Sequence, residues 1–216
     1  MTNTHSSQAK SLLRAIASIL LVAVAMGCST AKRPDELVDV QKTVPGVVLD
    51  IRYATTNNFT GQQLYPFSKC YLRQPSAEKL RAAQAELAMM GYGLKIYDGY
   101  RPLSVQKKMW EVYPHPGYVA DPKKGSRHNR GAAVDVTLIR LSDGSELLMP
   151  TSYDDFTEKA HRNFSDLPAE AISNRELLEQ VLTKHGFVGL ATEWWHFDDR
   201  EWRMYPLLDI AIPPAP

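Results

Sequence analysis

A carboxylate inside an apolar strand constrains this chain more than any other sequence feature. The pattern of residues 132–139 predicts a strand, and Asp135 lies inside its apolar part, Ala132–Val136. A buried carboxylate is costly in free energy unless it is paired or bound to a metal ion. His128 lies seven residues earlier, in a loop rich in Pro, Gly and Lys that spans residues 114–131. A metal site is one interpretation; a surface histidine and an aspartate at a strand edge are the other.

The segment Glu193-Trp194-Trp195-His196 brings a second histidine and another carboxylate. Neighbouring residues of a strand point to opposite faces, so a bulge or bend is needed for Glu193 and His196 to converge. Two imidazoles and one carboxylate form a tripod suited to Zn²⁺ that leaves a fourth position for water, and a further carboxylate supplies the general base. By itself the segment is also typical of a Trp-rich core strand with a hydrogen-bonded histidine.

Composition excludes several other classes of protein. The 25 Lys and Arg residues nearly balance the 24 Asp and Glu residues, so the chain lacks the basic excess typical of nucleic-acid binding, and we expect no nucleic-acid partner. Only two cysteines are present, Cys28 and Cys70, which rules out a disulfide framework and a Cys-rich zinc module. A metal site in this chain would therefore use histidines and carboxylates.

The first 27 residues are typical of an export signal rather than of a folded domain. They contain Lys10 and Arg14 but no acidic residue, and their apolar run over 15–26 is shorter than the roughly 20 residues that a membrane-spanning helix needs. The run ends in AMGC at residues 25–28, which resembles a bacterial lipobox with Cys28 as the lipidated first residue of the mature chain. We expect an exported, periplasmic or cell-surface lipoprotein; ordinary signal-peptidase cleavage and an uncleaved anchor are the alternatives.

The remaining sequence predicts a polar tether over residues 28–45 and one domain over residues 46–216. Hydrophobic spacing and capping residues predict three helices, which begin at Ser76, Ser104 and Asn174 and end near Gly91, Val112 and Gly186. Strands are predicted over residues 47–52, 94–97, 132–139, 146–149 and 191–198, the third and fourth joined by a hairpin. This mixture indicates the α+β class, with a central antiparallel sheet packed by helices.

Two motifs together resemble a known family. SRHNRGAAVD at residues 126–135, followed by EWWH at residues 193–196, is similar to the VanX-type D-alanyl-D-alanine dipeptidases of the zinc D-Ala-D-Ala peptidase family. Further blocks match in the same order and with similar spacing: RYAT and NFTG at residues 52–61, GYG at 91–93, DGYRP at 98–102 and GYVA at 117–120. The resemblance extends from about Val47 to Tyr205 and implies the α+β fold of that family.

The resemblance implies a role for each matching residue of the reaction centre. His128, Asp135 and His196 would hold one Zn²⁺ per chain, Glu193 would be the catalytic base, and Arg101 would polarise the scissile carbonyl and stabilise its oxyanion. These roles agree with the chemistry, because zinc lowers the pKa of bound water to about 7 and a guanidinium stays charged at any working pH.

The resemblance also implies contacts with the substrate. Asp154 matches the residue that meets the substrate ammonium, although its neighbour Asp155 makes a shift by one residue an alternative. Ser126 and Tyr53 match positions that line the dipeptide pocket; a capping hydroxyl and a core tyrosine are the simpler interpretations. Asp98 is expected to orient Arg101 or a metal ligand.

We therefore expect hydrolysis of the dipeptide D-Ala-D-Ala to two D-Ala, in scavenging or remodelling of the cell wall. A D,D- or L,D-carboxypeptidase that trims peptidoglycan stem peptides is the nearest alternative. An inactive, zinc-stabilised binding lipoprotein is an alternative of another class. The presence of Glu193 and Arg101 argues against the latter, because a structural zinc needs neither residue.

Overall fold

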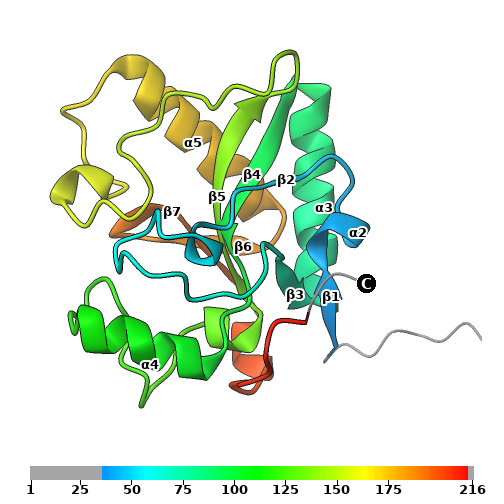
Figure 1. Cartoon of the computed structure of the whole chain (residues 1–216). Helices are drawn as coiled ribbons and strands as arrows, with labels where there is room; N and C mark the ends of the chain where they lie inside the picture. Colours follow the sequence, from blue (N-terminus) through cyan, green and yellow to red (C-terminus); the bar gives the residue numbers. More distant parts are fainter. Residues whose placement is uncertain (1–35, 214–216) are drawn as a thin grey trace, which may run out of the picture. The chain divides into compact units, whose positions relative to one another are not determined.

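The computed structural model describes residues 36–213, which form an α+β fold around a five-stranded sheet, as the sequence predicted (Figure 1). The strands lie in the order β2-β4-β5-β7-β6. Their bounds are Val48–Leu49 for β2, Tyr92–Asp98 for β4, Ala133–Arg140 for β5, Glu193–Asp199 for β7 and Phe187–Leu190 for β6.

The sheet is mixed rather than purely antiparallel. β2 runs parallel to β4, whereas the other neighbouring strands are antiparallel. Between β2 and β4 the chain passes through the strand β3 (Tyr71–Arg73) and the helix α3 (Gln74–Met89), and such a crossover connection is what a parallel pair requires. The expectation of an antiparallel sheet is therefore wrong at this edge.

Two long helices cover one face of the sheet. α3 packs along β4, α5 (Ala169–Lys184) packs along β6, and the two helices contact each other (Figure 1). Leu80, Leu87, Leu178 and Leu182 are fully buried between these helices and the strands. Asp199 on β7 points to this face, because Ser76 and Lys79 of α3 bind its carboxylate. By the alternation of strand side chains, His196 and Asp198 point to the opposite face.

The starts of two helices differ from the prediction. α3 begins at Gln74 with Pro75 in its first turn, so Ser76 is inside the helix and its hydroxyl donates to Asp199 at 2.6 Å instead of capping. α5 begins at Ala169, after Pro168, and Asn174 lies within it, with its amide donating to the Leu148 carbonyl oxygen at 2.9 Å. Each helix thus has a proline next to its first residue, Pro75 after Gln74 and Pro168 before Ala169, where its fixed φ and missing N–H are compatible with a helix start. The third helix, α4, spans Leu103–Val112, close to the prediction.

Three predicted strands also differ. The first, over 47–52, is limited to β2 at Val48–Leu49, and Arg52 begins a 3-10 helix. The return of the hairpin is a single bridge between Ile139 and Glu146 rather than a strand over 146–149. The last predicted strand, 191–198, corresponds to β7, which begins two residues later and ends one residue later, and β6 precedes it unpredicted. Short 3-10 helices complete the chain: η1 (Arg52–Ala54), η2 (His128–Arg130), η3 (Glu158–Ala160) and η4 (Trp202–Met204).

The segment expected to be a tether belongs to the fold from residue 36 onward. Leu37–Asp39 forms β1, which pairs antiparallel with β3, and Val40–Thr43 forms the short helix α2. Val40 and Val44 are fully buried, so apolar packing holds this segment despite its polar composition. The expected boundary at residue 46 is therefore too late.

The expected signal peptide, residues 1–27, and Cys28 lie outside the described residues. Within residues 36–213, we find no helix with the length and apolar character needed to cross a membrane.

Candidate metal centre and active site

Three neighbouring strands carry the central polar residues at one level of the sheet. Asp135 on β5 is paired with His196 on β7 and with Asp98 on β4. Residues that are directly opposite on antiparallel strands project from the same face and lie close together. The face that the helices leave free therefore gathers two carboxylates and an imidazole, and η2 adds His128 from the loop that precedes β5.

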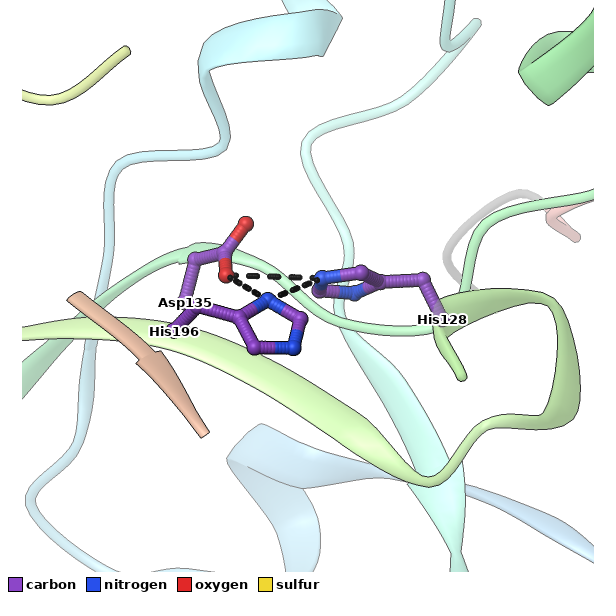
Figure 2. A group of neighbouring side chains, drawn as sticks. All are labelled: His128, Asp135 and His196. Carbon is purple, nitrogen blue, oxygen red and sulfur yellow. Dashed lines mark hydrogen bonds and ion pairs between the residues drawn. The ribbon is translucent and has the colours of Figure 1, made fainter. Parts of the chain in front are cut away.

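The three predicted metal ligands converge on one point (Figure 2). His128 Nε2 lies 3.1 Å from His196 Nδ1 and 3.4 Å from Asp135 Oδ1, and His196 Nδ1 lies 3.0 Å from Asp135 Oδ1. A tetrahedral zinc with bonds of about 2.0–2.1 Å has ligand atoms roughly 3.3 Å apart. All three side chains are buried. The triangle thus has the size and the donor set of a zinc site.

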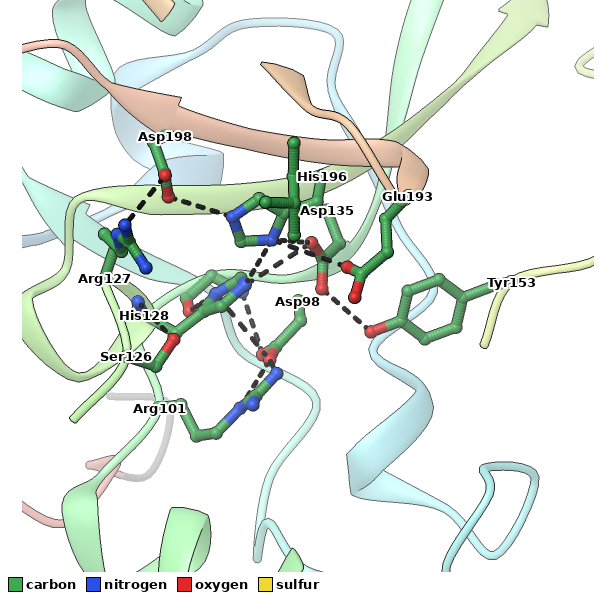
Figure 3. Close-up of polar contacts among 12 residues, drawn as sticks. Asp98, Arg101, Ser126, Arg127, His128, Asp135, Tyr153, Glu193, His196 and Asp198 are labelled. Atoms are coloured by element: carbon green, nitrogen blue, oxygen red, sulfur yellow. Dashed lines mark hydrogen bonds and ion pairs between the residues drawn. The ribbon is translucent and has the colours of Figure 1, made fainter. Parts of the chain in front are cut away.

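The far nitrogen of each imidazole is held by an acceptor, which orients the near nitrogen toward the triangle. His128 Nδ1 lies 2.7 Å from the Gly99 carbonyl oxygen, and His196 Nε2 lies 2.9 Å from Asp198 Oδ1 (Figure 3). When these nitrogens donate their protons, the nitrogens that face Asp135 keep free lone pairs. Such partners are typical of metal-binding histidines, because they fix both the tautomer and the ring orientation.

The electrostatics of the cluster favour positive charge. Burial lowers the pKa of His196, but the Asp198 and Asp135 carboxylates outweigh it and raise this pKa to about 10. Burial raises the pKa of Asp135, but the two imidazoles outweigh it and hold that pKa well below its usual range. A site that stabilises a proton between carboxylates so strongly would also stabilise a cation placed among the same atoms.

The side chains of Glu193 and His196 lie close together, and the bulge that this requires is present. The register between β6 and β7 shifts between Gly189 and Leu190, and Glu193 Oε2 lies 3.9 Å from His196 Nδ1. The Glu193 side chain is buried, and burial is the main cause that raises its pKa to about 7. A carboxylate with a pKa near neutral is well matched to taking up and releasing a proton.

Arg101 is held rigidly at the wall of the site. Its Nε and Nη2 donate to Asp98 Oδ2 at 3.0 and 2.7 Å, and its Nη1 donates to Gln106 Oε1 at 2.9 Å. Asp98 is itself fixed by the Tyr65 hydroxyl at 2.8 Å. These contacts do not use all five N–H donors of the guanidinium, so Arg101 can still donate to a ligand.

A pocket of about 140 Å³ opens beside the triangle. Glu193, Arg101 and Ser126 line it together with all three predicted metal ligands. It is less than half the usual minimum of about 300 Å³ for drug-sized ligand pockets, so it suits a very small ligand. The Ser126 hydroxyl also accepts from the His128 backbone N–H at 3.2 Å, so it caps the turn as well as lining the pocket. A larger cavity of about 690 Å³ beside Tyr97 and Trp194 is lined by none of the triangle residues and by neither Glu193 nor Arg101.

Asp154 and Tyr53 contact each other but do not line the pocket of about 140 Å³ beside the triangle. The Tyr53 hydroxyl lies 3.1 and 3.2 Å from the two carboxylate oxygens of Asp154, which lines a separate cavity of about 260 Å³. Burial and then the Asp135 charge hold the pKa of Asp154 well above its usual range. Asp154 has a φ of 59°, the left-handed region that is costly for a residue with a side chain. Asp155 instead accepts from the Thr157 backbone N–H at 3.0 Å, so it caps a turn.

Sequence reasoning missed two partners of the triangle. Asp198 holds His196, and the Tyr153 hydroxyl donates to Asp135 Oδ2 at 2.9 Å (Figure 3). Asp198 follows His196 by two residues, and this strand spacing could have placed both on one face. Tyr153 reaches Asp135 from a loop distant in sequence, so no local pattern indicates it.

Comparisons with known proteins agree with the sequence resemblance. A family model described as D-Ala-D-Ala dipeptidase, of peptidase family M15, matches residues 33–206. A D-alanyl-D-alanine dipeptidase of Escherichia coli (strain K12) is 38% identical over 173 residues, which cover 80% of this chain and 89% of the relative. A D-alanyl-D-alanine dipeptidase of Enterococcus faecium is 31% identical over 181 residues, which cover 73% and 88%.

Among solved structures, that of the LdcB LD-carboxypeptidase gives a TM-score of 0.44 at 18% identity and covers 81% of this chain and 73% of that one. The family assignment rests on the sequence matches, which extend from the first described strand to beyond β7 and include both motifs that hold the triangle. On this basis the chain belongs to the D-alanyl-D-alanine dipeptidase family of metallopeptidases.

Proposed function

We propose that this chain is a zinc-dependent dipeptidase that hydrolyses D-Ala-D-Ala to two D-Ala. The observation that carries the proposal is the buried triangle of His128, Asp135 and His196 with Glu193 at its side and a pocket of about 140 Å³ in front of it. The names of the curated relatives support the choice of substrate. A merely structural metal would require neither a base nor a pocket.

We assign the triangle as the ligands of one Zn²⁺ per chain. The residues fit this ion, because the donor set is two imidazoles and one carboxylate and the far nitrogens of both imidazoles are held by acceptors. When bound, zinc supplies Lewis-acid chemistry to a water molecule and to the scissile carbonyl group.

Glu193 and Arg101 would supply the remaining groups of the reaction. Glu193, with its pKa near 7, takes a proton from the attacking water and returns it to the leaving amine. Arg101, fixed by Asp98 and Gln106, offers its unused N–H donors to the oxygen on which negative charge develops. Because Arg101 is already positioned, little reorganisation is needed during the reaction.

We propose Ser126, Tyr53 and Asp154 as the substrate-binding residues. Ser126 lines the pocket directly. Asp154 lies close to the site through its partner Tyr53. Arg101 Cζ is 5.2 Å from the Tyr53 ring centroid, and the Tyr53 hydroxyl lies 3.4 Å from that of Tyr153, which donates to Asp135. An arriving substrate ammonium would pair with the Asp154 carboxylate, and Tyr53 would hold this carboxylate in place.

The test is an assay of the purified protein on D-Ala-D-Ala, L-Ala-L-Ala and a stem pentapeptide, with zinc analysis of the same sample. The proposal predicts rapid release of D-Ala from the first substrate alone. Preferential cleavage of the pentapeptide would replace the dipeptidase with the carboxypeptidase. Bound zinc without hydrolysis of any of the three would favour the inactive binding lipoprotein.

We also propose that the chain is exported and anchored to a bacterial membrane by lipid on Cys28. The support is the sequence alone, with two basic residues, an apolar run over 15–26 and AMGC at residues 25–28. An exported enzyme would meet D-Ala-D-Ala released during wall turnover, so we favour scavenging or remodelling as its role. Cys28→Ser should abolish metabolic labelling with a lipid precursor, and equal labelling of variant and parent would refute the anchor.

A further inference from the structure

The end of β7 that carries the proposed base is irregular. Leu190 is paired with Glu193 and Gly189 with Phe197, so one step along β6 corresponds to four steps along β7. In this register no residue of β6 is paired with Trp194, Trp195 or His196. Such a bulge leaves backbone carbonyls without their usual ladder partners, and buried carbonyls need other donors.

A single residue from another segment satisfies these carbonyls. Arg162 lies in the loop between η3 and α5, and its side chain donates to the carbonyl oxygens of Leu190 at 2.9 Å, Trp194 at 3.0 Å and His196 at 2.8 Å. Its own backbone N–H donates to the Ala191 carbonyl oxygen at 3.0 Å. Arg162 therefore binds four carbonyls within residues 190–196, on both sides of Glu193.

The guanidinium has a closely fitting site. It packs over the ring of Phe197 on β7, with 4.3 Å between Cζ and the ring centroid, and Nη1 lies 3.2 Å from Glu179 Oε2. A Cβ added to Gly189 would lie far inside van der Waals contact with Cζ and Nε of Arg162. The absence of a side chain at Gly189 is thus what admits the guanidinium to this position on β6.

From these contacts we infer that Arg162 is a positioning residue that sets the bulge of β7 and thereby places Glu193 and His196 relative to each other. The inference rests on the proposed function, because Glu193 and His196 are the groups that it positions. Arg162 does not line the pocket, and its side-chain hydrogen bonds in this region all go to the backbone of residues 190–196. Its charge also interacts with that of Glu193, and Arg162→Lys keeps this charge. Misplacement of a reacting group by about 1 Å can cost roughly 100-fold in rate.

Two independent variants displace the guanidinium contacts. Arg162→Lys keeps the positive charge but loses the planar fork that reaches three carbonyls at once. Gly189→Ala leaves Arg162 unchanged and pushes its guanidinium away. Each variant has a matched control. Glu179→Gln removes only the ion pair of the same guanidinium, and Gly93→Ala adds a methyl group on β4 against the end of the Leu141 side chain.

The experiment measures kcat and KM on D-Ala-D-Ala and the visible absorption of the Co²⁺-substituted protein, which reports the coordination geometry. Circular dichroism shows which variants fold. We expect kcat to fall about 100-fold for Arg162→Lys and for Gly189→Ala, with a changed Co²⁺ spectrum and a smaller change in KM. Both controls should keep kcat within about threefold of the parent. Because both variants act through one guanidinium, their effects should be less than additive in the double variant.

The inference is overturned if folded Arg162→Lys and Gly189→Ala keep the kcat and the Co²⁺ spectrum of the parent, or if their effects add fully. Should one variant not fold, the other decides. If the parent itself does not hydrolyse D-Ala-D-Ala, the proposed function fails, and the Co²⁺ spectra alone then decide whether Arg162 sets the geometry at His196.

Discussion

The two halves of the proposed active site, the metal ligands with Glu193 and the substrate contacts, are built from different kinds of structure. On the metal side, Asp135 on β5 is paired in register with His196 on β7, and His128 stands on a short helix just before β5. Glu193 lies at the start of β7, beyond the register shift. On the substrate side, Tyr53 lies in a 3-10 helix and Asp154 in a loop with left-handed backbone. Hydrogen bonds join His196 to His128 and to Asp135, whereas Asp154 relies mainly on Tyr53.

In the proposed function, the residues that carry out the reaction therefore lie on different structural elements from the residues that select the substrate. A strand-built centre tolerates little displacement, which suits a metal and a proton carrier that must keep their distances. Residues on loops can be exchanged at small cost to the fold, which suits the recognition of different substrate ends. We therefore expect changes on the metal side to act on turnover and changes on the substrate side to act on substrate preference.

The largest effect is expected at Glu193. Glu193→Gln should lower kcat on D-Ala-D-Ala by about 10²–10⁴-fold, because an amide cannot carry the proton, while zinc content stays that of the parent. Steady-state kinetics measures kcat, and metal analysis measures the zinc content. Glu170→Gln, on an exposed residue of α5, is the matched control and should change neither kcat nor zinc content. Near-parental turnover of Glu193→Gln with zinc retained would remove Glu193 from the mechanism.

A smaller but substrate-dependent effect is expected at Asp154. Acetylation of the substrate amine removes the charge that this carboxylate would pair with, and such a loss costs about 2–5 kcal/mol, so kcat/KM should fall at least about thirtyfold. Asp154→Asn should also lower kcat/KM on the free dipeptide. The ratio of kcat/KM for the free dipeptide to that for the acetylated dipeptide should therefore be smaller in the variant than in the parent.

Asp155→Asn is the control for this comparison, because the Asp155 carboxylate caps a turn by accepting from the Thr157 backbone N–H. Equal cleavage of free and acetylated dipeptide by the parent would exclude Asp154 as the ammonium partner. It would also favour the carboxypeptidase alternative, whose substrate continues past that point as an amide.

A third prediction concerns the partner of His196. Asp198→Ala removes the acceptor that lies 2.9 Å from Nε2, so the imidazole loses its fixed orientation. Zinc affinity should fall about 10–100-fold, as is typical when the partner of a metal-binding histidine is lost. Competition with a chelator measures this affinity, with Asp143→Ala in an exposed turn as the control. Unchanged affinity would show that the metal side does not depend on Asp198.

The smallest effect concerns stability. The pKa of Asp154 is raised in the folded protein, mainly by burial, whereas in the unfolded chain it is about 3.9. Between these two values the folded state binds more protons, so the contribution of Asp154 to stability declines as pH rises. Asp154→Asn removes that decline, and asparagine tolerates the left-handed backbone. The Tm difference, variant minus parent, should be more positive at pH 7 than at pH 4; the opposite trend would contradict the raised pKa.

Local sequence patterns account for the clustering of the proposed metal ligands better than for the position of the proposed substrate contacts. The cost of burying a carboxylate indicated a partner or a metal ion at Asp135. Strand alternation indicated that a bulge is needed to bring Glu193 and His196 together. The substrate side depended on the family resemblance, because nothing in the sequence around Asp154 indicates a left-handed residue or a tyrosine partner about 100 residues away.

The fold shows the same division. The α+β class and the three long helices follow from periodicity, but the start of α5 at Ala169 and the folding of residues 36–45 do not. Val40 and Val44 are buried in a region where β1 pairs with β3 and α2 packs against α3, and both are contacts between segments distant in sequence. Arg162 is likewise positioned by tertiary contacts alone.

The most direct test of the central claim is a zinc titration of the metal-free protein, followed by D-Ala-D-Ala hydrolysis. If the triangle is the catalytic site, activity should rise linearly and stop rising at one zinc per chain, and His196→Ala should gain no activity over the same range. His185→Ala, on a half-buried histidine that pairs with Glu86 and lies outside the triangle, should follow the parent curve. Full activity of the metal-free protein, or a His196→Ala curve equal to that of the parent, would contradict the account.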